Sequence, residues 1–491
     1  MIRIIGGGLA GSEAAWQAAS RGVPVTLFEM RPVRPTAVHK TDRLAELVCS
    51  NSFRGDKLDN AVGLLKEEMR RLGSLVMRAA EASRVPAGAA LAVDRERFAN
   101  TITEALTSHA LITIVREEVP AIPDSSERDP VIVATGPLTS EALSDDLARL
   151  VGGKHLYFYD AISPIVLAET IDRSKVFRAS RWNRSLSVRL KPDPTDDSND
   201  AGRVRLQADR DGPDRDGPAC GVDDGEGDYL NCPMTREEYE RFYDALVHAE
   251  SATVHDFDKE KFFEGCLPIE VMAHRGVDTL RFGPMKPVGL VDPRTGREPY
   301  AAVQLRQDNL AGDHYSLVGF QTQIKWGDQA RVLRLIPGLE QAEFVRFGMV
   351  HRNTYVNGPT VLAETWQVRR RPTLFFAGQM SGVEGYVESA ASGLLAGLNA
   401  AALANGEPAS APPRTTAIGA LAYYVSHANP AHYEPSNITF GIMAPLANAP
   451  RNKLARKLAM AARALQDLAG WMDARADVRG RASALEAATG S

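Results

Sequence analysis

The sequence predicts an α/β protein with a discontinuous parallel-sheet domain, an inserted α+β domain and a C-terminal helical segment. Three observations predict this class. A short strand, a glycine turn and a helix open the chain, and a buried strand of the same kind that ends in glycine lies far along the chain, near Phe376. Between them the patterning changes, and the length of 491 residues corresponds to about three domains of typical size.

The chain begins with a dinucleotide-binding pattern. Ile2–Ile5 is a short apolar strand candidate, and a helix rich in alanine is expected over residues 12–21. Six residues form the turn between them: Gly6, Gly7, Gly8, Leu9, Ala10 and Gly11. In this setting Gly6 permits the tight turn, Gly8 lets the backbone approach a pyrophosphate, and Gly11 allows close helix packing. The helix N-terminus offers free N–H groups and a positive dipole to phosphate.

The next strand candidate, residues 24–28, ends in an acidic residue. The Glu29 carboxylate can accept hydrogen bonds from ribose hydroxyls, which the dinucleotide fingerprint requires at this place. A glycine turn without a ligand is the alternative for a bare fingerprint, but strand, helix and acidic residue are all present here. FAD and NAD both use this fingerprint, so these residues alone do not choose between the two.

Two later segments favour FAD. Residues 130–134 form an apolar strand candidate that can return the chain beside the first strand, and residues 373–376 form another. The turns after these two strands contain four candidate cofactor contacts: Thr135, Gly136, Gly378 and Gln379. A helix of small residues follows the second turn, and its N-terminus can face a phosphate or the pyrimidine edge of a flavin.

A nucleotide fold that opens at residue 1 and closes near residue 400 implies a domain interrupted by an insertion. We expect residues 1–158 and 345–445 to form the FAD-binding domain, and residues 159–344 to form an inserted substrate domain. Residues 446–491 are expected to be a basic helical segment.

Hydrophobic periodicity predicts the remaining elements. They are helices over 62–82, 95–106, 235–249 and 453–481, and strands within 301–326. The small, apolar run 389–403 is interrupted by Gly393, Gly397 and Asn399. We therefore expect a closely packed core helix there and no membrane span.

The net charge of −5 has its origin in one segment. Residues 191–228 hold 12 acidic and 5 basic residues and are rich in Gly and Pro, so we expect a mobile acidic loop. The rest of the chain is then slightly basic. The total charge argues against a protein coated in nucleic acid, but it allows a local basic patch.

Four cysteines are too few and too scattered for a disulfide framework, and they form no CxxC pair or zinc-like cluster. The N-terminal residues leave no room for a signal peptide before the glycine turn. We therefore expect a cytoplasmic protein without a metal site.

Several longer strings resemble one enzyme family. They are ELVCSNSFR (46–54), YLNCPMT (229–235), FEGCLPIE (263–270), RFGPMKPVG (281–289), QLRQDN (304–309) and HRNT (351–354). On these strings the chain resembles the folate- and FAD-dependent tRNA (uracil-5-)-methyltransferase family, from the first residues to about Leu446. The resemblance implies an FAD-binding Rossmann-like domain and methylation of the T-loop uridine at position 54 of tRNA. It also implies that 5,10-methylenetetrahydrofolate gives the carbon and that reduced FAD, regenerated by NADH or NADPH, gives the hydride.

Methylation of uracil at C5 by this route requires a nucleophile, and cysteine fits that role. Uracil C5 is a poor nucleophile, and a thiolate that adds to C6 converts the ring to an enolate that can attack the methylene carbon. The resemblance implies that both Cys49 and Cys232 take part. We assign Cys232 as the nucleophile and Cys49 as a general base or alternative nucleophile near the flavin. Cys220 and Cys266 are expected to be unreactive.

The resemblance also suggests further contacts. His351 and Asn353 are candidates to hold the folate or flavin ring, although a structural role is equally compatible with them. Phe347 stands where many family members have Tyr, so it keeps the stacking surface but lacks the hydroxyl donor. Candidate tRNA phosphate contacts lie in the basic C-terminal segment: Lys453, Arg456 and Lys457. A solvated helix face is the alternative for these three.

Other functions stay open at this point. A flavin and folate methyltransferase could act on rRNA, a flavin oxidoreductase could act on a small metabolite, and an RNA-binding flavoprotein could lack methyltransferase activity. The sequence does not choose between NADH and NADPH, and it does not give the oligomeric state.

Overall fold

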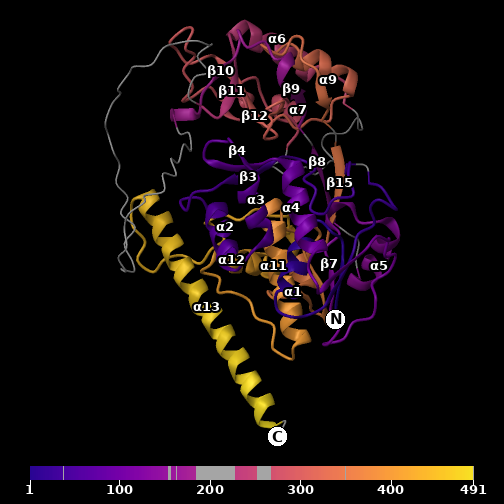
Figure 1. Cartoon of the computed structure of the whole chain (residues 1–491). Coiled ribbons are helices and arrows are strands. Elements are labelled where there is room, and N and C mark those ends of the chain that lie inside the picture. The colour runs from indigo at the N-terminus through magenta and orange to yellow at the C-terminus, as the bar shows by residue number, and fades with distance from the viewer. Residues whose placement is uncertain are drawn as a thin grey trace, which may run out of the picture.

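The computed structural model describes residues 1–36, 38–152, 156–161, 163–183, 227–251, 267–348 and 350–489. In Figure 1 the inserted domain lies above the nucleotide domain, and a long C-terminal helix runs along one side. Most of the predicted acidic loop 191–228 lies outside the described residues. Cys220 and Cys266 also lie outside them.

The nucleotide domain is built on a six-stranded sheet with the order β16-β17-β7-β1-β2-β6. Its strands are β1 (Ile2–Ile5), β2 (Val25–Phe28), β6 (Ile112–Val115), β7 (Val131–Val133), β16 (Gln367–Val368) and β17 (Arg371–Phe376). All neighbours are parallel except β16, which is antiparallel to β17. Because β17 pairs with β7 across more than 200 residues of chain, the domain is discontinuous, as predicted.

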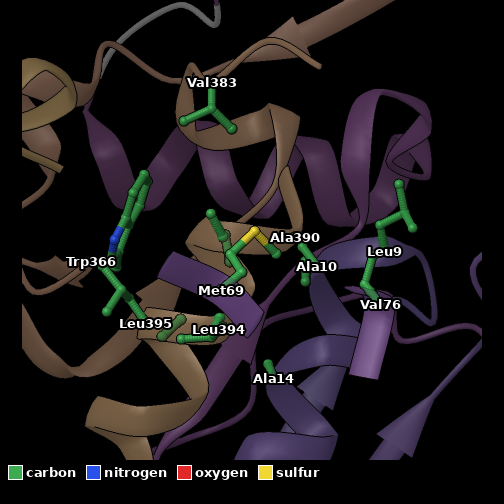
Figure 2. Close-up of a cluster of buried hydrophobic side chains, with 14 of the residues drawn as sticks. Leu9, Ala10, Ala14, Met69, Val76, Trp366, Val383, Ala390, Leu394 and Leu395 are labelled. Carbon is green, nitrogen blue, oxygen red and sulfur yellow. The ribbon is translucent and has the colours of Figure 1, made fainter. Parts of the chain in front are cut away.

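Two helices rich in small residues pack closely beside this sheet. They are α1 (Leu9–Ala19) and α11 (Tyr386–Ala404). A Cβ atom on Gly393 would lie 2.1 Å from the carbonyl oxygen of Ala10, so the two backbones could not approach this closely with a larger residue. Figure 2 shows Ala10 beside Ala390 in the shared core. α11 is long and apolar enough to cross a membrane by composition, but 83% of its most apolar window is buried, as expected for a core helix.

The prediction of one helix over 62–82 is wrong. The chain forms α2 (Ala61–Arg71) and α3 (Leu75–Ala82), with a break at Leu72–Ser74. Gly73 adopts a φ of +74°, which ends the first helix, and the Ser74 hydroxyl accepts a hydrogen bond from the Met77 N–H to cap the second. The apolar periodicity continues across the break, so periodicity alone could not find it.

The rest of the nucleotide domain surrounds this core. Its other helices are α4 (Arg95–Thr107), α5 (Glu141–Val151), α10 (Gly358–Val361) and α12 (Ala417–His427). A small sheet with the order β3-β5-β4 contains β3 (Ser52–Gly55), β4 (Arg84–Val85) and β5 (Ala90–Val93). The C-terminal helix α13 (Lys453–Thr489) packs on the domain through Met460, Ala461, Ala464 and Leu468, and its end extends beyond the body (Figure 1).

The inserted domain has its own sheet and its own core. The strand order is β10-β11-β12-β13-β9-β14. The strands are β9 (Ile165–Leu167), β10 (Phe177–Arg178), β11 (Tyr229–Met234), β12 (Ala301–Gln307), β13 (His314–Leu317) and β14 (Phe344–Arg346). Its helices are α6 (Arg236–Val247), α7 (Ile269–His274), α8 (Thr279–Phe282) and α9 (Trp326–Leu333). The antiparallel pair β8 (Leu156–Ala161) and β15 (Val350–Tyr355) joins the two domains.

The buried side chain of Glu68 ties α2 to α12. Both Glu68 side-chain oxygens accept hydrogen bonds from backbone N–H groups, one from Ala417 and one from Ile418, each at 2.8 Å. These N–H groups belong to the first turn of α12, where no earlier carbonyl in the helix can accept them. Glu68 therefore caps α12 from a different helix.

Replacing Glu68 with alanine should lower the free energy of unfolding by about 2–4 kcal/mol, because two buried N–H groups lose their acceptor. Guanidinium denaturation followed by circular dichroism measures this loss. Glu67→Ala is the matched control, because Glu67 is the preceding residue on the same helix and forms ion pairs with Arg70 and Arg71 nearer the surface. That variant should lose less than about 0.5 kcal/mol. Equal losses in the two variants would contradict the capping role.

Candidate active site

A cavity of about 470 Å³ opens at the carboxyl ends of the parallel strands. Gly6 follows β1, Glu29 follows β2, Ala134 follows β7 and Gly378 lies just after β17, and all four line the cavity. This edge of an open parallel sheet is where ligands bind in such folds. Residues of the inserted domain, including Arg306 and Leu317, close the opposite side.

The glycine turn has the geometry of a dinucleotide cradle. Gly6 adopts a φ of +102°, and its N–H donates to the carbonyl oxygen of Phe28 at 2.8 Å. Gly11 packs so closely that a Cβ atom there would lie 1.8 Å from the Gly6 carbonyl oxygen. At Gly8, in contrast, no atom lies within 4 Å of the place that a Cβ would take. The backbone at Gly8 therefore faces open cavity, which fits the pyrophosphate of FAD.

Glu29 is held in place at the end of β2. Its Oε2 accepts a hydrogen bond from the Gly7 N–H at 3.0 Å, and its Oε1 accepts one from Arg31 Nε at 2.9 Å. Burial disfavours the charged form, but the hydrogen bonds and charge of Arg31, with the Gly7 N–H, hold the pKa of Glu29 below its usual value. The side chain is thus a fixed carboxylate on the cavity wall, where a ribose would lie.

Replacing Glu29 with glutamine should weaken FAD binding by roughly tenfold or more, because a charge-assisted hydrogen bond becomes a neutral one. Equilibrium titration of the apoprotein with FAD measures the change. Glu96→Gln is the control, since Glu96 is an exposed residue that pairs with Arg43 on the surface. An unchanged affinity of Glu29→Gln for FAD would show that Glu29 does not bind the ribose.

Four residues that are predicted to contact the cofactor follow β7 and β17. Thr135, Gly136, Gly378 and Gln379 all line the cavity. The Gly378 N–H donates to Ser392 Oγ on α11 at 2.7 Å, which fixes the turn against that helix. The side chain of Gln379 donates to Glu384 at 2.6 Å.

Cys49 lies on the wall of the same cavity. It belongs to the segment Leu47–Asn51, which passes in front of the N-terminus of α11. The hydroxyl oxygen of Tyr386, the first residue of α11, accepts hydrogen bonds from the N–H groups of Cys49 at 2.8 Å and Ser50 at 3.1 Å. Cys49 is therefore anchored through its backbone beside the open space.

Cys232 lies elsewhere. It is fully buried in β11, in the hydrophobic core of the inserted domain, and burial raises the pKa of its thiol well above the usual range. Asn231, the neighbour of Cys232 on β11, lies opposite Gln304 of β12, and both side chains are on the same face of the sheet as Arg306. Cys232 lies opposite Val303, and these two side chains are on the other face, which packs into the core. Side chains alternate along a strand, so Cys232 points away from the nucleotide domain. The structure does not bring Cys49 and Cys232 together, and the nucleophile role of Cys232 stays a prediction without access to the cavity.

Of the other predicted contacts, Phe347 and the three cations of the C-terminal segment do not line this cavity. Phe347 stacks on Phe344 at 5.2 Å between ring centroids and on Trp326 at 6.3 Å. His351 and Asn353 belong to β15, but their side chains lie outside the described part of the structure. Three cations, Lys453, Arg456 and Lys457, lie in the first turns of α13, outside the cavity.

The sequence analysis missed several polar side chains near the cavity. Arg54 pairs with the buried Glu388 of α11 and also contacts Asn437, and it holds a φ of +61°, unusual for a residue with a side chain. Arg95, Arg306 and Arg346 contact the Cys49 segment. Arg54 and Arg306 lie within the strings that resemble the enzyme family, so that resemblance could have identified them as candidates. Among the described residues no cluster of His, Cys, Asp and Glu could hold a metal ion.

Comparisons with known proteins agree with this geometry. The family model described as GIDA, glucose inhibited division protein A, matches residues 1–200 and 219–408. The chain is 56% identical over 473 residues to the methylenetetrahydrofolate–tRNA-(uracil-5-)-methyltransferase TrmFO of Desulforudis audaxviator, covering 96% of this chain and 98% of that protein. It is 55% identical over 465 residues to the protein of the same name from Moorella thermoacetica, covering 95% and 97%. The solved structure of Aquifex aeolicus GidA in its form I crystal has a TM-score of 0.65 at 20% identity, covering 95% of this chain and 75% of that one, and so supports the fold.

Proposed function

The chain belongs to the TrmFO family of methylenetetrahydrofolate–tRNA-(uracil-5-)-methyltransferases, and on that premise we propose that it converts the T-loop uridine at position 54 of tRNA to ribothymidine. It methylates uracil C5 in tRNA with carbon from 5,10-methylenetetrahydrofolate. One observation carries the proposal for its mechanism. The cavity that holds the dinucleotide cradle also has Cys49 on its wall.

FAD fits the cradle formed by Gly8, Glu29 and the turns after β7 and β17, and when bound in its reduced form it supplies the hydride that completes the methyl group. NADH or NADPH is proposed as the source of that hydride. The cytoplasm is the proposed location, because tRNA and the nicotinamide nucleotides are both available there.

The position of Cys49 supports a role as nucleophile. A thiolate there can add to C6 of a uracil ring placed in the cavity, and this addition makes C5 nucleophilic toward the methylene carbon. The base must first leave the T-loop stack to enter the cavity. Cys232 is buried in the core of the inserted domain, whereas Cys49 lies on the cavity wall, so we propose the alternative role of nucleophile for Cys49, and the assignment of Cys232 stays a prediction.

Incubation with unmodified tRNA, NADPH and 5,10-methylenetetrahydrofolate labelled on the methylene carbon tests the function. Label should appear in the tRNA, and it should be absent when the transcript carries cytidine at position 54. NADPH oxidation without label would favour an oxidoreductase of a small metabolite. RNA binding without label or NADPH oxidation would favour an RNA-binding flavoprotein.

A further inference from the structure

Three arginines from three elements converge on the Cys49 segment. Arg346, at the end of β14, donates to the carbonyl oxygens of Val48 at 3.0 Å and Cys49 at 3.1 Å. Arg95, at the start of α4, donates to the carbonyl oxygen of Leu47 at 2.8 Å. Arg95 belongs to the nucleotide domain, and Arg346 belongs to β14 in the sheet of the inserted domain, which extends two residues past the expected boundary at residue 344, so both domains hold the segment.

Arg306 of β12 is the third arginine. Its Nη2 donates to Ser50 Oγ and its Nε to Asn51 Oδ1, each at 2.8 Å. The side chain lines the cavity together with Cys49 and Ser50, although only 9% of the residue is exposed. A guanidinium group is therefore buried directly beside the cysteine segment.

The charges in this cluster do not balance. Asp308 pairs with Arg95, with 3.0 Å between Oδ2 and Nε. Within the described ranges, Arg306 and Arg346 have hydrogen bonds only to neutral oxygens and no ion pair with a carboxylate. Arg346 Nε is buried and has no hydrogen-bond partner there. Burying a charge without a counter-charge is costly, so an anion is expected to complete the cluster.

The electrostatics of the cluster indicate which group can supply the missing negative charge. Burial, together with the charge of Arg95, lowers the pKa of Arg346 to about 10, so this guanidinium still carries its charge at neutral pH. Burial lowers the pKa of Arg306 and Arg346, and negative charges on Asp308 and Cys49 oppose this lowering; the same two groups help to raise the pKa of Arg95 against its burial. Burial raises the pKa of Tyr386, so its hydroxyl stays neutral. Asp308 is one carboxylate among three guanidinium groups and is paired directly with Arg95, so Cys49 is the further described group in this cluster that can become an anion.

We propose that Arg306 and Arg346 are positioning residues that keep the sulfur of Cys49 in the thiolate form at the cavity wall. They act through Cys49, since their hydrogen bonds go to its own carbonyl oxygen and to its neighbours. The catalytic consequence rests on the proposed function. The thiolate itself does not depend on it, because the cluster is complete in the protein alone.

The rate of Cys49 alkylation by iodoacetamide tests the inference in the FAD-bound protein, without RNA or folate. Mass spectrometry of the Cys49 peptide follows this cysteine separately from the other three. Arg306→Gln and Arg346→Gln should each slow alkylation at pH 7 by about tenfold and move the pH of half-maximal rate upward. At high pH, where the thiol ionises without help, their rates should approach that of the unchanged protein.

Conservative variants separate charge from shape. Arg346→Lys keeps the charge but loses the fork to two carbonyl oxygens, so it should keep most of the alkylation rate at pH 7. Arg294→Gln is the matched control, because Arg294 is a forked arginine of the same domain that pairs with Asp292, and it should change nothing. Bound FAD, seen by its absorbance, reports that each variant is folded. If Arg306→Gln does not fold, Arg346→Gln and Arg346→Lys carry the test.

Three results would overturn the inference. Alkylation could be unchanged in Arg306→Gln and Arg346→Gln. It could be slowed equally at every pH, which would indicate a change of shape only. It could also be unchanged while KM for folate or tRNA rises, which would make the arginines a site for an anion of the substrate. Failure of methyl transfer in the unchanged protein would sink the proposed function but would leave the alkylation result intact.

Discussion

Cys49→Ala should reduce methyl transfer by at least roughly 10³-fold while FAD stays bound. The thiol lies on the cavity wall, whereas the glycine turn and Glu29, which form the cradle, do not depend on it. Removing a nucleophile removes the covalent route to an activated C5, and no other described cysteine reaches the cavity. Label transfer to unmodified tRNA gives the rate, and flavin absorbance gives the FAD content.

Cys232→Ala is the matched comparison for the covalent step. RNA that carries 5-fluorouridine at the target position forms a stable adduct with an attacking thiolate, because the fluorine cannot leave as the proton does. The adduct should form with Cys232→Ala and be absent with Cys49→Ala. The reverse pattern would return the nucleophile role to Cys232 and would require the inserted domain to open its core.

Gly8→Val should leave the protein folded but weaken FAD binding by about 100-fold or more. Gly8 has a φ of −74° and a ψ of −169°, which other residues adopt readily, and no atom lies within 4 Å of its Cβ position. The valine side chain would therefore project into the cavity where the pyrophosphate belongs, and the loss of close backbone contact would cost about 3 kcal/mol of binding free energy.

Titration of the apoprotein with FAD measures this affinity. Gly327→Val is the control, because Gly327 of α9 also has open space at its Cβ position but lies outside the cavity. It should bind FAD normally. Normal binding by Gly8→Val would show that the nucleotide lies elsewhere.

Local signals predicted the nucleotide domain well. The strand, turn and helix from Ile2 to Ala19 are specified by neighbouring residues, and the apolar run that ends at Phe376 could only be a buried strand. The α2–α3 break was missed because Gly73 and Ser74 interrupt an apolar pattern that continues on both sides.

The arrangement of the active site depends on contacts between distant segments. The sequence shows that Cys232 lies in a strand-like string, but not which face of the strand meets the core; that is decided by how β11 pairs with β12 and how the helices cover the sheet. Arg95, Arg306 and Arg346 meet at Cys49 only because the two domains dock there. The spacing of these arginines along the chain does not predict that they meet.

The origin of the methyl hydrogens tests the central claim most directly. The substrate is 5,10-methylenetetrahydrofolate that carries deuterium on the methylene carbon and at C6, supplied with unlabelled NADPH, unmodified tRNA and the FAD-bound protein. Mass spectrometry of the nucleoside from position 54 should show a methyl group with two deuterium atoms and one hydrogen, since the folate gives the carbon and the reduced flavin gives the hydride. Three deuterium atoms would show that the folate also supplies the hydride, and a methyl group without deuterium would show a different carbon donor; either result would contradict the account.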